Sequence, residues 1–246
     1  MGFVQSDGTQ WSVEELVAME FAYIKHLAEN VAGEKVIDVV VTVPPYFSQF
    51  ERDAIVDSIE IAGLKTLALI NDGTAVAVNY ALTRTFSKPE YHIIYDAGAS
   101  GIRATVASFT TANDPKSSVA ETRINVGGVG YDRSTSGTEL DRRMRDILID
   151  VFNARHKKDI RGDKRGMAKL WKEAQRVKSI LSANSETVSQ VESLAWDIDF
   201  KTKVTRVEFE AKCEDLIDKF AKPVLIALKN ADLTLVILLP FLCSLI

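Results

Sequence analysis

A run of β-branched residues constrains the fold of this chain most strongly. Residues 36–43 are almost continuously apolar and are followed by two prolines, a pattern typical of a strand that is buried on both faces. A capping box, Ser-x-x-Glu, precedes the run at Ser12 and Glu15, and a second one follows it at Ser48 and Glu51. Such boxes satisfy free backbone N–H groups at the start of a helix. The strand is therefore predicted to lie between two helices.

The rest of the first eighty residues continues this alternation. The two helices are expected to end at Gly33 and Gly63, because glycine tolerates the left-handed conformation found after a helix. A short strand at 67–70 then turns, through residues 71–74, into a helix that extends to Tyr80. The order helix, strand, helix, strand, helix requires crossover connections, so the two strands are predicted to pair in parallel.

The second half of the chain begins with consecutive strands and continues with helices. The elements that we predict there are strands at 91–96, 104–109, 118–126, 187–194 and 196–204, and helices from near Thr138, at 164–183 and from Thr205. The first of these helices is expected to be capped through Asp141, and Pro223 is expected to break the last one. Gly127, Gly128 and Gly130 follow the third strand and are expected to form an ordinary loop.

Composition excludes several classes of function. The chain has 246 residues, and its formal net charge of −4 provides no global basic field for nucleic acid. Its cysteines, Cys213 and Cys243, form no pair or cluster, so neither a disulfide framework nor a metal site is predicted. The apolar run at 233–246 is shorter than the roughly 20 residues of a membrane-spanning helix. A buried strand is the favoured interpretation of this run, and a short membrane tail is the alternative. No secretory signal is recognised at the amino end.

The segment around Asp96 is the most informative for chemistry. Asp96 ends an apolar strand, and five small residues turn the chain directly after it: Ala97, Gly98, Ala99, Ser100 and Gly101. Backbone N–H groups of such a turn can approach a phosphate closely, and the carboxylate can hold Mg²⁺ directly or through its waters. A plain tight hairpin with a turn aspartate is the simpler interpretation of the same residues.

Three other places are weaker candidates. Asp72 lies at a strand-to-helix junction, where a carboxylate can position a water for attack on a phosphate, although a helix cap with an Asx turn is simpler. Gln175, Lys178 and Ser182 share one face of the long helix and suit a nucleoside, but equally a solvated face. Gly137 permits close approach of a phosphate at a helix start, or lies in an ordinary loop.

Taken in order, these segments resemble the nucleotide-binding domain of the heat shock protein 70 family. The resemblance is in register from about Trp11 to Leu233. It rests on residues 39–47, similar to VVTVPAYF, 61–64, identical to IAGL, 71–75, similar to NEPTA, 96–103, in the place of DLGGGTFD, 175–182, in the place of ERAKRTLS, and 199–209, similar to DF…TRARFE. Residues 128–133, 167–170, 177–184 and 203–210 resemble the large endoplasmic-reticulum branch, the glucose-regulated or hypoxia-up-regulated type.

The resemblance implies the actin-like ATPase, or ribonuclease H-like, fold: an α/β protein with two lobes around a nucleotide cleft, here incomplete. ATP or ADP with Mg²⁺ are the implied ligands. Asp96, the implied metal ligand, lies with Gly98, Ala99, Ser100 and Gly101 in the second phosphate hairpin. The remaining implied site residues are Asp72, near the metal and attacking water, Gly137, near the phosphates, and Gln175, Lys178 and Ser182, near the adenosine.

Departures from the family pattern bear on activity. Arg103 stands where the family has a second aspartate, and Gly101 where it has threonine. Gly73 replaces a proline, Gln175 replaces the acid that holds the ribose, and Ser179 replaces an arginine that stacks on adenine. Lost neutral hydrogen bonds cost roughly 0.5–1.5 kcal/mol each, and lost charged ones more. We therefore expect nucleotide binding to be better preserved than hydrolysis, so ATPase activity is left open.

The resemblance also implies a domain organisation. The expected parts are residues 1–86 as part of the first lobe, 87–135 with 213–233 as the core of the second lobe, 136–212 as its outer subdomain, and 234–246 as an apolar tail outside the family pattern. The resemblance implies that the family's first phosphate hairpin would precede Met1 and that its adenosine loop would follow Leu233. Weak or absent nucleotide binding is therefore expected for this chain.

The implied function is that of an ATP-binding chaperone fragment in protein folding and quality control in the endoplasmic reticulum lumen. Its implied partners are a smaller lumenal chaperone of the same family and unfolded polypeptides. Two alternatives stay open: a nucleotide-exchange module that does not hydrolyse ATP, and a truncated product without function.

Overall fold

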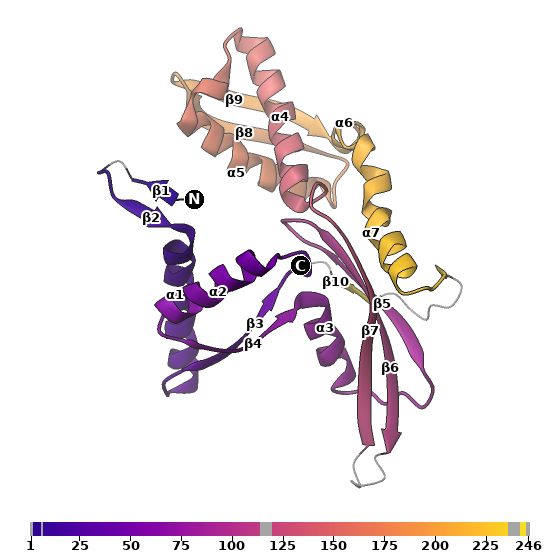
Figure 1. Ribbon diagram of the computed structural model, residues 1–246. Helices are drawn as coiled ribbons and strands as arrows, with labels where there is room; N and C mark the ends of the chain where they lie inside the picture. The colour runs from indigo at the N-terminus through magenta and orange to yellow at the C-terminus, as the bar shows by residue number, and fades with distance from the viewer. Residues whose placement is uncertain (1, 6, 114–119, 236–241, 245–246) are drawn as a thin grey trace. The chain divides into compact units, whose positions relative to one another are not determined.

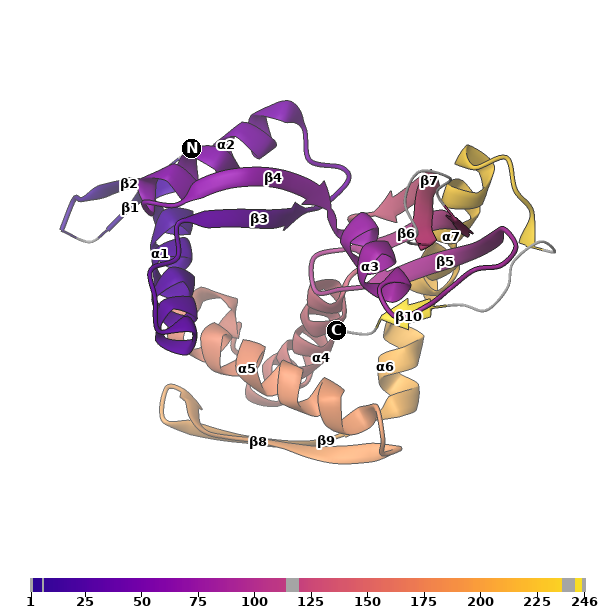
Figure 2. The same cartoon turned by 90° about the horizontal axis from the view of Figure 1, so that it is seen from below.

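The computed structural model describes residues 2–5, 7–113, 120–235 and 242–244. The chain divides into two compact units: Met1–Lys88 with Phe109–Ile124, and Pro89–Ser108 with Asn125–Ile246. Figures 1 and 2 label the helices and strands of both units. Each unit contains helices and strands, as the predicted α/β class requires.

The first unit alternates helices and strands, as predicted. Its elements are β1 (Gly2–Val4), β2 (Gln10–Ser12), α1 (Val13–Ala32), β3 (Asp38–Val43), α2 (Gln49–Ile61), β4 (Lys65–Asn71) and α3 (Asp72–Ala81). Strands β1 and β2 are antiparallel. Strands β3 and β4 are parallel, with Asp38 opposite Lys65 and Val43 opposite Asn71. The predicted parallel pairing is confirmed.

The predicted helix boundaries of this unit depend on local hydrogen bonds, and they are confirmed. Both capping boxes form, with Ser12 and Ser48 as N-caps of α1 and α2. Gly33 ends α1 with φ 72°, and Gly63 follows α2 with φ 69°. These left-handed conformations favour glycine because it has no Cβ atom.

The prediction that β3 is buried on both faces is wrong. Exposure alternates along the strand: Val43 is buried, whereas Val40 is 55% exposed. Within the described residues, β3 and β4 form a sheet of two strands, and α2 and α3 contact β4. One covered face produces this alternation, because successive side chains point to opposite sides of a strand.

The second unit contains a four-stranded sheet in the order β10-β5-β6-β7. Its strands are β5 (Glu90–Ala97), β6 (Ile102–Asn113), β7 (Ala120–Asp132) and β10 (Leu242–Ser244). The C-terminal end of β6 and the N-terminal end of β7 belong to the first unit. Strand β10 runs parallel to β5, so part of the apolar C-terminal run forms a strand; residues 236–241 and 245–246 lie outside the described residues.

Three glycines that were predicted to form a loop lie within β7, so that prediction is wrong. Helix α7 (Ile217–Asn230) lies directly against this strand. A Cβ atom at Gly128 would lie 2.1 Å from the carbonyl oxygen of Ala227, and one at Gly130 would lie 2.1 Å from that of Pro223. The side chain of Asn230 also donates a hydrogen bond to the carbonyl of Val129 (2.9 Å). The glycines therefore allow the helix backbone to approach the strand.

The prediction that Pro223 breaks the last helix is also wrong, because α7 continues through it. The inner face of α7 packs on the sheet through Val224, Ala227 and Leu228, which compensates for the missing N–H. The helical segment is interrupted instead after α6 (Arg206–Lys212), where the 3₁₀ turn η2 (Glu214–Leu216) precedes α7.

The remaining part of the second unit packs two helices on a strand pair. Its elements are α4 (Gly137–His156), the 3₁₀ turn η1 (Ile160–Gly162), α5 (Lys164–Leu181), β8 (Glu186–Ala195) and β9 (Ile198–Thr205). Figure 2 shows β8 and β9 running along α5. Apolar side chains from both helices and both strands form one core, which includes Phe152, Leu170 and Phe200. This core positions the start of α4 and the last turns of α5, where the candidate site lies.

Candidate functional site

The small-residue turn forms a closed loop between β5 and β6. The backbone N–H of Gly98 donates to the carbonyl of Gly101 (3.0 Å). A Cβ atom at Gly101 would lie 3.0 Å from the carbonyl oxygen of Asp132, so the end of the turn lies against the end of β7. Ala99 and Ser100 are exposed at its tip. The predicted hairpin is confirmed, and its tip is accessible to a ligand.

The turn is docked on the first residues of α4. The N–H groups of Gly137 and Thr138 donate to the carbonyls of Gly98 and Ala99, both at 3.0 Å. The hydroxyl of Ser136 accepts from the N–H of Glu139 (3.1 Å). Ser136, and not Asp141, is therefore the cap of α4, which corrects the sequence prediction. Because these N–H groups have partners, α4 positions the turn and a phosphate would bind the turn itself.

Helix α5 contributes Lys178 and Gln175 to the same place. The ammonium group of Lys178 lies 2.6 Å from Oδ1 of Asp141 and donates to the carbonyl of Gly137 (3.2 Å). The amide of Gln175 donates to Oδ2 of Asp141 (3.4 Å). Asp141 is 6% exposed, so it fixes both side chains beside the start of α4. The hydroxyl of Ser182 instead donates to Ser179 of its own helix (2.6 Å).

Asp96 and Arg103 form an ion pair beneath the turn. Nη2 of Arg103 lies 2.8 Å from Oδ2 of Asp96, and the side chains are 14% and 22% exposed. A Cβ atom at Gly98 would lie 3.2 Å from Nη2 of Arg103 and 3.6 Å from Oδ1 of Asp96. Both charged groups therefore lie directly against the turn. The sequence indicates the unusual residue at 103, but not this contact.

Asp72 lies in the first unit, at the first residue of α3. Its Oδ1 atom accepts from the N–H of Gly73 (2.7 Å). The N-cap is Asn71, whose side-chain oxygen accepts from Arg52 (3.0 Å). A carboxylate in the first turn of a helix interacts favourably with the helix dipole. This position of Asp72 is close to the helix cap with an Asx turn, the simpler of the two interpretations of the sequence.

A cationic hollow of about 620 Å³ adjoins the start of α4. Its lining includes five cationic and three hydroxyl side chains: Arg133, Arg142, Arg143, Arg145 and Lys219, with Ser134, Ser136 and Thr138. Glu139 also lines it, and Asp146 and Asp215 pair with arginines of the lining. The cations exceed these carboxylates in number, so the hollow favours an anionic ligand.

Glu139 organises the arginines of this hollow. It accepts hydrogen bonds from Arg142 (2.7 and 2.6 Å) and from Arg143 (2.9 Å). The two bonds from Arg142 and the one from Arg143 outweigh partial burial and lower the pKa of Glu139 from 4.5 to about 2. Arg143 also pairs with Asp215, which raises the pKa of this arginine. Glu139 is therefore ionised at neutral pH and holds two arginines in this hollow.

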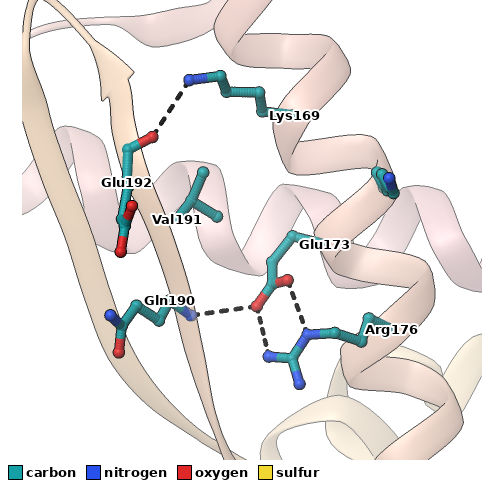
Figure 3. A pocket seen from close by; sticks show the side chains of 7 residues that line it. Lys169, Glu173, Arg176, Gln190, Val191 and Glu192 are labelled. Carbon is teal, nitrogen blue, oxygen red and sulfur yellow. Dashed lines mark hydrogen bonds and ion pairs between the residues drawn. The ribbon is translucent and has the colours of Figure 1, made fainter.

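A larger groove, of about 710 Å³, lies between α5 and β8, away from these residues. Figure 3 shows that its polar groups face one another. Glu173 accepts two hydrogen bonds from Arg176 (2.8 and 2.7 Å) and one from the backbone of Gln190 (3.1 Å). Lys169 donates to the carbonyl of Glu192 (3.1 Å).

These contacts cap the outer edge of β8. Glu173 and Lys169 of α5 bind backbone groups of Gln190 and Glu192, which a further strand would otherwise use. Burial opposes ionisation of Glu173, but the hydrogen bonds that it accepts lower its pKa. We do not interpret this groove as a ligand site, although large pockets are the usual first candidates.

The residues of the second unit fit the phosphate groups of a nucleotide better than they fit Mg²⁺. The exposed turn and the cationic hollow suit an anion, whereas the carboxylate of Asp96 already binds Arg103. Among the described residues, no group of three or more His, Cys, Asp or Glu side chains could hold a metal ion.

No described helix is long and apolar enough to cross a membrane.

A small-residue turn between two strands, held on the start of a helix beside a cationic hollow, is the candidate anion site of this α/β domain. The family model described as "Hsp70 protein" matches residues 3–236. The chain therefore belongs to the heat shock protein 70 family, whose nucleotide-binding domain has the actin-like ATPase fold.

Curated relatives extend this result. Hypoxia up-regulated protein 1 of Danio rerio is 45% identical over 238 residues, which cover 95% of this chain and 24% of that protein. The protein of that name in Homo sapiens is 39% identical over 240 residues, with the same coverage of 95% and 24%. Heat shock protein 70 homolog lhs1 of Schizosaccharomyces pombe is 41% identical over 237 residues, covering 95% and 28%. The chain thus spans about a quarter of the length of these relatives.

Proposed function

We propose that this chain binds ATP or ADP as the nucleotide-binding part of a chaperone of the heat shock protein 70 family. The observation that carries the proposal is the exposed turn of Gly98, Ala99, Ser100 and Gly101, held by two backbone hydrogen bonds on the start of α4. A docked turn is pre-organised for a phosphate, because its backbone needs no further ordering. The cationic hollow beside α4 adds attraction for an anion.

Within this proposal, the last turns of α5 face the adenosine side of the nucleotide. Lys178 is the strongest candidate, because its ammonium group contacts both Asp141 and the carbonyl of Gly137. Gln175 shares the Asp141 contact, and Ser182 lies one turn beyond Lys178 on the helix. A Cβ atom at Gly137 would lie 3.4 Å from the Cα atom of Ala99, an ordinary van der Waals contact, so Gly137 lies against the turn and is proposed to lie near the phosphates.

Calorimetric titration of the chain with ADP and ATP tests the proposal. We expect saturable binding with a dissociation constant above about 1 μM, equivalent to about 8 kcal/mol. Lys178→Ala should weaken it by about tenfold or more, because a hydrogen bond to a charged group contributes about 1.5–3 kcal/mol. Lys172→Ala, on the same helix but in the α5–β8 groove, is the matched control. Absence of heat at millimolar nucleotide, or equal affinity in the two variants, contradicts the proposal.

We propose further that binding, and not hydrolysis, is the main activity. The observation that favours it is the ion pair of Asp96 with Arg103, because a carboxylate held by a guanidinium group is a poor acceptor for a proton. Asp72 remains the proposed position for a water-orienting carboxylate. A single-turnover assay with ATP should show slow turnover, and Asp72→Asn should leave ADP affinity unchanged. Turnover on the scale of seconds would contradict this part of the proposal.

The cellular role is proposed from family membership. We infer a chaperone of the endoplasmic reticulum lumen that acts on unfolded polypeptides together with a smaller lumenal chaperone of the same family. Release of fluorescent ADP from that smaller chaperone is the assay for an exchange function. Acceleration by this chain supports exchange, and an unchanged rate over a tenfold range of its concentration contradicts it.

A further inference from the structure

The ion pair beneath the turn has a geometry that concerns metal binding. Asp96 is the next-to-last residue of β5 and Arg103 is the second residue of β6, so the hairpin brings them together. Their charged groups are 2.8 Å apart, and both lie within van der Waals reach of the Cβ position of Gly98. A phosphate group on the turn would therefore lie beside a carboxylate that is already paired.

A carboxylate next to a phosphate needs a positive charge between or beside them, because the two anions repel each other. Mg²⁺ commonly supplies that charge, bound by one or two carboxylates and by phosphate oxygens. A guanidinium group supplies it permanently, since arginine is not deprotonated in proteins. It also repels a second cation, so a carboxylate that binds Arg103 is a poor ligand for Mg²⁺.

We propose that Arg103 takes the place of a divalent cation at Asp96, so that the turn at residues 98–101 binds the phosphate groups of a nucleotide without magnesium. This inference rests on the proposed nucleotide binding. It assigns Arg103 as the residue that determines whether nucleotide binding depends on a metal ion. Asp96 then acts as the ion-pair partner of Arg103 and not as a metal ligand.

The main experiment measures ADP affinity in excess Mg²⁺ and in EDTA. The wild-type dissociation constant should change by less than about threefold between the two conditions. Arg103→Gln leaves the carboxylate of Asp96 unpaired, so its affinity in EDTA should fall by about tenfold or more and recover with Mg²⁺. Arg103→Lys keeps the charge and should behave like the wild type.

The double variant Asp96→Asn with Arg103→Gln separates electrostatics from loss of structure. It removes both charges, so its affinity should again be insensitive to Mg²⁺. A double variant that remains dependent on Mg²⁺ would contradict the inference, as would a wild-type chain that loses affinity about tenfold in EDTA. Thermal unfolding followed by circular dichroism checks that each variant is folded.

A second measurement does not require nucleotide. Mn²⁺ alone is titrated into each protein, and the free ion is followed by electron paramagnetic resonance. Arg103→Gln should bind one Mn²⁺ at least about threefold more tightly than the wild type, and the double variant should lose this site. Equal Mn²⁺ affinity in the wild type and Arg103→Gln overturns the inference. Wild type that binds no ADP in any condition refutes the proposed function instead, and the Mn²⁺ result then decides the role of Arg103 by itself.

Discussion

Replacing Gly128 with alanine tests how closely α7 lies on β7. The added Cβ atom would lie 2.1 Å from the carbonyl oxygen of Ala227, 2.8 Å from the nitrogen of Ala231 and 3.1 Å from the Cβ atom of Ala231. The first two contacts are with backbone, which cannot rotate away as a flexible side chain can. The helix must shift, and overpacking of this kind costs about 1–3 kcal/mol, occasionally more. Because the helix covers buried Ile93 and Val106, we expect a value near the upper end.

Urea unfolding followed by far-ultraviolet circular dichroism measures the effect. With a slope of about 1–3 kcal/mol per molar urea, a loss of about 2–3 kcal/mol should lower the unfolding midpoint by about 1 M. Gly162→Ala is the matched control, because no atom lies within 4 Å of its Cβ position, and it should change stability by less than about 0.5 kcal/mol. Equal midpoints for the two variants would refute the close packing and would favour a loop at residues 127–130.

Three further predictions use other parts of the chain. Ser48→Ala should reduce the unfolding free energy by about 1 kcal/mol, because it removes the cap of α2; an unchanged melting temperature would count against the capping box. Leu170→Ala, at a fully buried core position, should cost about 2–5 kcal/mol, and chemical unfolding that detects less than 1 kcal/mol contradicts the core assignment. Glu139 has a folded pKa of about 2 against an ordinary 4.5, so its stabilisation is complete above about pH 4.5 and is lost as the pH falls toward 2. Glu139→Gln should therefore destabilise the protein by about 1–3 kcal/mol at pH 7 and match the wild type at pH 2; a constant difference across this range would contradict the ion-pair network.

Elements that depend on neighbouring residues could be predicted from the sequence. The capping boxes at Ser12 and Ser48 formed as predicted, because all of their hydrogen-bonding groups lie within four residues. The turn after Asp96 was predicted for the same reason, since five small residues between two apolar runs leave few other conformations. The α/β class followed from the alternation of these local signals.

Features that depend on distant parts of the chain could not be predicted in this way. Gly128 looks like a loop residue until α7, about a hundred residues later, packs on it. Pro223 looks like a helix break until the sheet supports the helix that contains it. The continuous β-branched run of β3 predicts burial, but its exposure is set by how many faces of the sheet are covered.

The candidate site shows the same division. The pair of Asp96 and Arg103 spans one short hairpin, and the sequence indicated both residues without their contact. Asp141 and Lys178 pair across two helices and lie 37 positions apart in the sequence (178 − 141). Nothing local to Asp141 distinguishes a buried ion pair from the helix cap that was predicted there.

Hydrogen exchange with and without ADP tests the central claim most directly, because it reports which backbone segments the nucleotide protects. Exchange should slow most in peptides that contain residues 96–103 and the start of α4, and to a smaller extent in the part of α5 around Lys178. Exchange in the α5–β8 groove around Glu173 should be unchanged. Protection confined to that groove, or no protection of the turn at saturating ADP, would contradict nucleotide binding at this site.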